Sequence, residues 1–178
     1  GLGLAVVWGT VKDNYGYINV QSEEGKGSIF TLYFPVTRKD IPAEAVALSM
    51  SEYMGKGEYI LVVDDVKGQR DLAAEMLKTL NYNVTSVSSG EEAVAYLEEH
   101  KADLMVLDMI MDPGMDGLDT YRSVLEIHPS QKAIIVSGFS ETDRVNAAQS
   151  LGAGAYVRKP YVMEKLGLAV RKELVRSM

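Results

Sequence analysis

The sequence predicts an α/β protein in which a five-stranded parallel, doubly wound sheet follows a small helix–strand–strand segment. From residue 58 onward, short apolar runs alternate with amphipathic stretches of helical length, a pattern typical of repeated β–α units. Parallel crossovers are right-handed, so such units build one sheet with helices on both faces. Before residue 37, one apolar helical stretch precedes two alternating strands around "GKG".

The five strand–helix units can be justified one by one. "YILVVDD" is an unbroken apolar run, typical of a strand buried on both faces. In the helix that follows this strand, Leu72, Met76 and Leu80 share one face. Ser89 and Glu92 form a capping box at the start of the helix expected over residues 90–100. The strands are expected in 59–65, 83–87, 102–108, 132–138 and 155–159, and the helices in 69–80, 90–100, 116–128, 140–152 and after Pro160.

The pattern divides the chain into three parts. Residues 1–38 form the α-β-β segment, residues 39–57 a linker with Pro42, small residues and "MGKGE", and residues 58–178 the parallel-sheet domain. The first residue is Gly1 rather than Met, so we expect a fragment of a longer protein.

Composition excludes several classes of function. The net charge is −7 without a run of Lys or Arg, which argues against nucleic acid as a partner. The absence of cysteine excludes disulfides, thiolate catalysis and Cys-based zinc sites. No apolar run is long enough to span a bilayer, and no signal peptide is recognisable. We therefore expect a cytoplasmic fragment without membrane contact.

Polar residues collect where the predicted strands end. The first strand ends in Asp64 and Asp65, the third in Asp108, the fourth in Ser137 and the fifth in Lys159. Each alone is most simply a helix cap, a turn residue or a solvated charge. Together they lie at the carboxyl edge of a parallel sheet, where such folds bind their ligands.

This combination of groups fits a divalent cation and a phosphoryl group. Three neighbouring carboxylates repel one another unless a cation neutralises them, and hard oxygen ligands favour Mg²⁺ or Mn²⁺ over zinc. Asp108 then fits a carboxylate nucleophile of the kind that forms an aspartyl phosphate. The metal and the Lys159 ammonium would stabilise the phosphoryl charge, and the Ser137 hydroxyl could donate a hydrogen bond to it.

The domain closely resembles the receiver domain of two-component signalling proteins. The resemblance covers about residues 57–178 and lies in "ILVVDD", Asp108 before "PGMDG", Ser137 in "IIVSGFS" and Lys159-Pro160 in "AYVRKPY". It implies a flavodoxin-like fold and a phosphoacceptor function, with a histidine kinase or a histidine phosphotransfer protein as the donor and partner. Ser137 and Lys159 would then contact the phosphoryl group.

The resemblance also implies roles for single residues. Asp108 would be the phosphoacceptor, and Asp65 a direct Mg²⁺ ligand, with Asp64 acting through water. The backbone carbonyl of Ile110 would complete the protein ligands. Tyr156, together with Ser137, would be the switch that changes the face formed by the last two helices and the Tyr156 strand.

One feature departs from the family pattern. The family commonly has proline four residues after the acceptor, whereas Pro113 is five after Asp108, so Asp112 looks like an insertion. The insertion would reshape the loop above the site without removing a chemical group.

Residues 1–36 resemble the last part of a histidine-kinase ATP-binding domain. Gly1-Leu2-Gly3-Leu4 matches the glycine-rich motif after the ATP lid, and the helix, "GKG" turn and "FTLYFPV" strand follow. The resemblance implies that Gly1 and Gly3 approach ATP phosphates in the parent protein. The upstream Mg²⁺ motif and the phosphorylatable His are absent, so we expect the C-terminal piece of a hybrid histidine kinase without kinase activity of its own.

Two other functions compete with the phosphoacceptor receiver. An aspartyl-nucleophile phosphohydrolase would need an acid two residues after the nucleophile, where this chain has Ile110. A receiver that only binds partners would not need all of the groups at the strand ends. The apolar residues of the first forty positions are also expected either to pack on the receiver of the same chain or to pair with a second copy in a homodimer.

Overall fold

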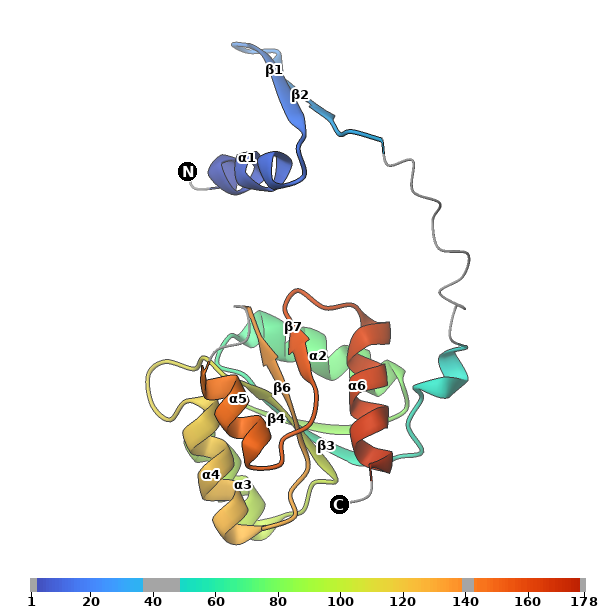
Figure 1. Ribbon diagram of the computed structural model, residues 1–178, viewed down its shortest axis with the longest axis vertical. Helices are drawn as coiled ribbons and strands as arrows, with labels where there is room; N and C mark the ends of the chain where they lie inside the picture. Colours follow the sequence, from blue (N-terminus) through green and yellow to red (C-terminus); the bar gives the residue numbers. More distant parts are fainter. Residues whose placement is uncertain (1–2, 37–48, 139–142, 177–178) are drawn as a thin grey trace. The chain divides into compact units, whose positions relative to one another are not determined.

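The computed structural model describes residues 3–36, 49–138 and 143–176, and the chain divides into two compact units, Gly1–Ala47 and Leu48–Met178 (Figure 1). Gly1 and the first part of the predicted linker, residues 39–48, lie outside the described residues.

Residues 3–36 of the N-terminal unit form one helix and one hairpin. Helix α1 (Gly3–Asp13) precedes strands β1 (Tyr17–Glu23) and β2 (Gly27–Tyr33), which pair antiparallel from Tyr17–Tyr33 to Glu23–Gly27. Gly25 and Gly27 have positive φ angles of 78° and 102° in the tight turn, a conformation that glycine adopts without a Cβ clash. The predicted order of helix, strand, turn and strand is present.

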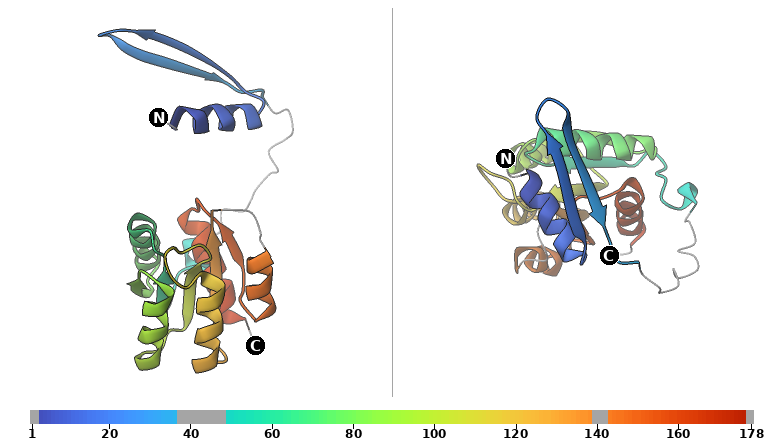
Figure 2. Two further views of the ribbon diagram at one scale, coloured as in Figure 1. Left: turned by 90° about the vertical axis from the view of Figure 1, so that its left-hand side faces the viewer. Right: turned by 90° about the horizontal axis from the view of Figure 1, so that it is seen from above.

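The second unit is the five-stranded parallel sheet, in the order β4-β3-β5-β6-β7. Further views show helices on both of its faces (Figure 2). Its elements are η1 (Met50–Glu52), β3 (Tyr59–Val63), α2 (Lys67–Thr79), β4 (Asn83–Val87), α3 (Gly90–Glu99), β5 (Leu104–Asp108), α4 (Gly117–Ile127), β6 (Ala133–Ser137), α5 (Asp143–Ser150), β7 (Tyr156–Arg158) and α6 (Met163–Val175).

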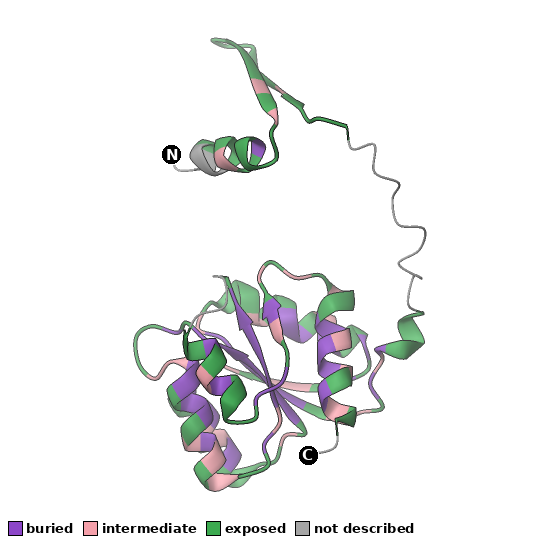
Figure 3. Ribbon diagram, in the orientation of Figure 1, coloured by how far each residue is buried: buried purple, intermediate pink, exposed green. Residues whose placement is uncertain are grey.

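The core consists of two apolar layers, one on each face of the sheet. Helices α3, α4 and α5 pack on the face that carries Leu61, Met105 and Ile135. Helices α2 and α6 pack on the opposite face, which carries Val62 and Ile134. All residues of β5 and β6 are buried, which explains their continuous apolar sequence (Figure 3).

The sheet unit begins before residue 58. Tyr53 is buried in the α2–α6 layer, and its carbonyl accepts a hydrogen bond from the Tyr82 hydroxyl at 3.2 Å. The Gly55 amide donates to the Leu80 carbonyl at 2.7 Å, and Arg171 pairs with Glu58 at 2.9 Å. Residues 49–57, expected as part of the linker, therefore pack on the sheet domain.

Candidate functional site at the carboxyl edge of the sheet

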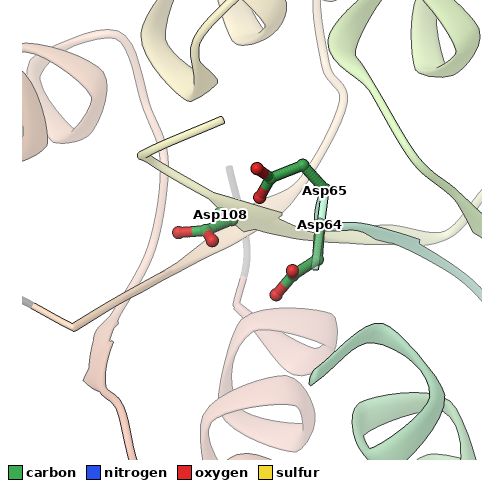
Figure 4. Close-up of side chains that lie close together, drawn as sticks. All are labelled: Asp64, Asp65 and Asp108. Carbon is green, nitrogen blue, oxygen red and sulfur yellow. The ribbon is translucent and has the colours of Figure 1, made fainter. Parts of the chain in front are cut away.

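Neighbouring strands bring the three acids together. Strands β3 and β5 are parallel with Val63 opposite Leu107, so the next residues, Asp64 and Asp108, leave the sheet side by side. With Asp65, they place carboxylate oxygens within 4.8 Å of one another (Figure 4). The predicted convergence of these acids at one edge is therefore present.

Lys159 bridges two of the three carboxylates. Its Nζ atom lies 2.6 Å from Oδ2 of Asp64 and 2.7 Å from Oδ2 of Asp108. The side chains are largely shielded from water, with exposed fractions of 11% for Lys159, 2% for Asp64 and 8% for Asp108. An ammonium held between two shielded carboxylates offsets part of their repulsion and forms charge-assisted hydrogen bonds.

Asp65 is differently placed from Asp64. Each oxygen of Asp64 already has a partner, because Oδ2 binds Lys159 and Oδ1 accepts from the Val66 amide at 2.9 Å. Asp65 Oδ2 accepts a long bond from the Asp112 amide at 3.4 Å, while its buried Oδ1 has no hydrogen-bond partner in the described part of the chain. A buried carboxylate oxygen without a donor is costly, so this atom fits a cation ligand. The all-oxygen donor set also matches Mg²⁺ chemistry.

The environment of Asp108 shifts the pKa of its carboxyl upward. Burial raises the pKa of the Asp108 carboxyl above its ordinary value, while the hydrogen bond and the charge of Lys159 act in the lowering direction. The Asp64 charge raises it again. Lys159 therefore does not fully offset the cost of burying the Asp108 charge, and an additional cation beside the carboxylate would lower its pKa.

Ser137 and Tyr156 meet through the backbone. Ser137 is buried at the end of β6, and its carbonyl accepts a hydrogen bond from the Lys159 amide at 2.8 Å. The same carbonyl accepts from the Tyr156 hydroxyl at 3.4 Å, and Tyr156 packs against the α3–α5 layer. These contacts connect the predicted switch residues to the strand that carries Lys159.

The loop after Asp108 is tied at several points. The Ile110 amide donates to Asp108 Oδ1 at 3.3 Å, and the Asp112 amide donates to Asp65 Oδ2 at 3.4 Å, so this loop contacts the acidic cluster. Gly117 lies so close to the Asp108 carbonyl that a Cβ at this position would collide with it. The "PGMDG" sequence thus lets helix α4 start directly beside the end of β5.

Sequence reasoning missed two residues that hold these loops. Arg70 Nη1 donates to the carbonyls of Asp64 at 2.6 Å and Asp65 at 3.3 Å. Glu91 accepts from the Met115 amide at 2.9 Å, and backbone hydrogen bonds lower the pKa of its carboxyl, its own amide first and then that of Met115. Their only sequence signal is a position in the first turns of α2 and α3, beside the loops they contact.

Tyr161 is a further missed neighbour of the acids. Burial raises the pKa of its phenol to about 12, and the charges of Asp64 and Asp108 add to the rise. With Gln69, Leu72, Lys159 and Pro160 it lines a hollow of about 330 Å³ on the α2 side of the site.

In the N-terminal unit, Gly3 is the first residue of α1, which agrees with its predicted position at the start of a helix.

The comparison with known families decides the identity of this domain. Residues 60–171 match the model of the response regulator receiver domain, which is more than half of the chain. The chain belongs to the response regulator receiver family. The predicted family and five-stranded doubly wound fold are confirmed, and the protein is a receiver of two-component signalling.

Three relatives of the receiver illustrate the similarity. The sensor kinase CckA of Brucella abortus is 29% identical over 99% of this chain, which spans only 20% of that relative's length. Sporulation initiation phosphotransferase F of Bacillus subtilis is 32% identical, over 66% of this chain and 94% of its own. The N-terminal domain of a response regulator from Carboxydothermus hydrogenoformans superposes with a TM-score of 0.62, at 28% identity, covering 66% of this chain and 94% of that chain.

None of the helices in the described part of the receiver and the N-terminal unit is long and apolar enough to cross a membrane.

Proposed function

We propose that this receiver accepts a phosphoryl group on Asp108 from a phosphohistidine of a histidine kinase or a histidine phosphotransfer protein. The observation that carries the proposal is the arrangement around Lys159. Its ammonium bridges Asp64 and Asp108 while a buried oxygen of Asp65 beside them has no partner among the described residues. A general acid–base pair or a helix cap would not need this combination of charges.

The transfer requires an ionised Asp108. One carboxylate oxygen attacks phosphorus, the phosphorus–nitrogen bond of the phosphohistidine breaks, and the imidazole keeps the bonding electrons and takes a proton from solvent. Lys159 stays within reach of the phosphoryl oxygens and neutralises their charge, since its ammonium already contacts Asp108 at 2.7 Å. The buried Ser137 hydroxyl donates a hydrogen bond to the arriving group.

Mg²⁺ fits the acidic cluster, and we assign Asp65, Asp108 and the backbone carbonyl of Ile110 as its protein ligands. The bound cation would neutralise charge on the carboxylates and on the phosphoryl oxygens. Asp64 acts through water, because Lys159 and the Val66 amide already occupy its oxygens. Asp65 keeps the unpartnered oxygen that a direct ligand needs.

Phosphorylation is proposed to switch the face formed by α5, β7 and α6. A phosphoryl group on Asp108 would draw the Ser137 hydroxyl toward it and shift the end of β6. Tyr156 would respond, because its hydroxyl bonds the Ser137 carbonyl. Ser137 and Tyr156 therefore form the proposed link between the site and the surface.

The whole chain is proposed to be part of a hybrid sensor histidine kinase. Its similarity to the sensor kinase CckA extends through residues 1–38, beyond the receiver. These residues would complete an ATP-binding domain, in which Gly1 and Gly3 approach the nucleotide phosphates, and 39–57 would connect it to the receiver. We place the receiver in the cytoplasm, with protein partners rather than nucleic acid or membrane.

Acetyl phosphate tests the acceptor directly. Incubation with Mg²⁺ should add the mass of one phosphoryl group to the intact chain, and Asp108→Asn should add none. Asp71→Asn, an exposed acid on α2, is the matched control and should label like the wild type. Labelling of Asp108→Asn to the wild-type extent would reject the acceptor. Absence of labelling in the wild type would favour the receiver that only binds partners.

Thermal melting with Mg²⁺ tests the ligand assignment. Saturation at one hundred times Kd should stabilise the chain by about 2.7 kcal/mol. Asp65→Ala should remove this stabilisation, Asp64→Ala should reduce it, and Asp71→Ala should retain it. An unchanged response in Asp65→Ala would show that Asp65 is not a ligand.

A phosphohydrolase is not supported. Ile110 follows Asp108 by two residues and its side chain is half-exposed, but it has no proton to donate to a leaving group.

A further inference from the structure

The segment between β5 and α4, residues 109–116, starts directly after the proposed phosphoacceptor, and we call it the acceptor loop. Two of its amides are bound by carboxylates of the acidic cluster. The Ile110 amide donates to Asp108 at 3.3 Å, and the Asp112 amide donates to Asp65 at 3.4 Å. Both distances are long for a hydrogen bond between an amide and an oxygen, so the acidic cluster holds the acceptor loop only weakly.

A third carboxylate holds the acceptor loop from outside the acidic cluster. Oε1 of Glu91, in the first turn of α3, accepts from the Met115 amide at 2.9 Å, which is the usual length of a strong bond of this type. The carboxyl group lies against Gly114, whose φ angle is 120°. A Cβ on this glycine would approach Oε1 to 2.8 Å. The missing side chain of Gly114 therefore makes room for the Glu91 carboxylate.

The backbone that carries Glu91 is fixed against helix α4. The Ser89 hydroxyl caps α3 by accepting from the Glu92 amide at 3.2 Å. Gly90 is buried, and a Cβ on it would collide with Oγ1 of Thr120 in α4. Helices α3 and α4 also pack side by side on one face of the sheet (Figure 2). Glu91 therefore holds the acceptor loop from a part of the receiver that is packed on the core.

The charge of Glu91 strengthens its bond to the acceptor loop. The hydrogen bond from its own amide, followed by the bond from the Met115 amide, lowers the pKa of the Glu91 carboxyl. The side chain is therefore ionised at neutral pH. An ionised acceptor binds an amide about twice as strongly as a neutral one.

Mg²⁺ would weaken the two bonds that come from the acidic cluster. In the proposed function, Asp65 and Asp108 bind the cation together with the Ile110 carbonyl, and oxygens that share their electrons with a cation are weaker acceptors for an amide. Glu91 is not a ligand, so its bond to the Met115 amide persists. We propose that Glu91 is a positioning residue that fixes the acceptor loop so that the Ile110 carbonyl can bind Mg²⁺. This role rests on the proposed function, because it requires the cation site.

Calorimetric titration of the full chain with Mg²⁺ measures this role. Glu91→Ala should weaken Mg²⁺ binding about tenfold, the lower end of what the loss of an outer partner costs a metal site. Glu91→Gln keeps an acceptor for the Met115 amide but loses the charge, so it should weaken binding only about threefold. Glu92→Ala is the matched control on the same helix turn. Glu92 accepts from the Ser88 amide at 2.7 Å rather than from the acceptor loop, so this variant should bind Mg²⁺ like the wild type.

Two further measurements separate positioning from a general loss of stability. In the metal-free chain, Glu91→Ala should make hydrogen exchange at the Met115 amide about tenfold faster, while the amides of β5 keep their protection. At saturating Mg²⁺, labelling of Glu91→Ala by acetyl phosphate should proceed within about twofold of the wild-type rate, because a residue that acts on metal binding alone changes affinity and not the transfer step.

Three results would overturn the proposal in a wild-type chain that binds Mg²⁺ and is labelled. Unchanged Mg²⁺ affinity in Glu91→Ala would show that the acceptor loop does not need this bond. An equal loss in Glu92→Ala would assign the effect to the stability of α3. Slow labelling of Glu91→Ala at saturating Mg²⁺, with unchanged affinity, would place Glu91 in the transfer step. A wild-type chain that neither binds Mg²⁺ nor is labelled would reject the proposed function itself, and this inference with it.

Discussion

The two units of this chain contain similar local structure but very different cores. In the described part of the N-terminal unit, Val11 is the one apolar side chain that is buried, while Trp8, Ile29 and Phe34 are half-exposed or more. In the receiver unit, β5 and β6 are buried along their whole length. Among the residues that the structure describes, both units satisfy backbone hydrogen bonds locally, but only the receiver covers both faces of its sheet. A regular hairpin is therefore no evidence of an independent fold.

The sharpest test of this contrast is amide hydrogen exchange along the full chain. Amides of β5 and β6 should be protected at least about 1,000-fold, because opening them requires unfolding that costs about 5 kcal/mol or more. Amides of β1 and β2 should exchange almost as fast as an unfolded peptide. Comparable protection of the hairpin would show that it has a core of its own or packs on another part of the chain.

Matched truncation of two isoleucines should show the same contrast in stability. Ile135 in β6 is fully buried, whereas Ile29 in β2 is 65% exposed. Ile135→Ala should lower the free energy of unfolding of the receiver by about 2–5 kcal/mol. Ile29→Ala should change it by less than about 0.5 kcal/mol. Urea unfolding followed by circular dichroism measures both, and similar losses would mean that β2 is packed in solution.

Alkaline pH should destabilise the receiver through its buried tyrosines. Burial, followed by the Glu58 charge, raises the pKa of Tyr82 from 10.0 to about 12. The raised pKa means that the folded state favours the neutral phenol. The full stability should therefore be present below pH 10, the pKa of this tyrosine in the unfolded chain, and should decline as the pH rises toward 12. The loss can reach about 3 kcal/mol for one such residue.

Unfolding of two variants between pH 9 and 12 isolates this effect. Tyr82→Phe should lower stability at neutral pH by about 1 kcal/mol through the lost bond to Tyr53, but flatten the alkaline decline. Tyr59→Phe, at an exposed position, should retain the wild-type decline. An equally steep decline in Tyr82→Phe would assign the effect to other groups.

The smallest expected effect is weak self-association through the N-terminal unit. Its exposed apolar side chains and open strand edges should raise the weight-average mass of the full chain with concentration. Residues 49–178 alone should sediment as a monomer. If both samples are monomers and residues 1–36 resist proteolysis, intramolecular packing would replace the dimer. If both dimerise equally, the receiver itself carries the contact, through α5, β7 and α6.

Several features of the site follow from sequence because strand ends in a parallel sheet meet at one edge. Apolar runs ending in Asp64, Asp65 and Asp108 predict that these acids lie together, and the structure places them so. The same reasoning does not reach Arg70 or Glu91. Their partners are backbone groups of loops, and a carbonyl or an amide has no signature in the sequence.

The start of the receiver shows the same limit. Small residues and glycines in 49–57 are typical of a linker, and their local pattern predicts nothing else. In the structure Tyr53 and Leu80 both pack against α6 at Gly167, where a Cβ would collide with either side chain. A single aromatic residue acquires this role only when a distant helix supplies the space.

The sequence by itself determined the order of strands and helices, the carboxyl edge as the site and Asp108 as the acceptor candidate, because periodicity and strand ends are local properties of the chain. Only the tertiary structure decided that Lys159 binds Asp64 and Asp108 and leaves an oxygen of Asp65 unpartnered. Such pairings join residues far apart in the chain, so they depend on distances that exist only after the helices have packed on the sheet.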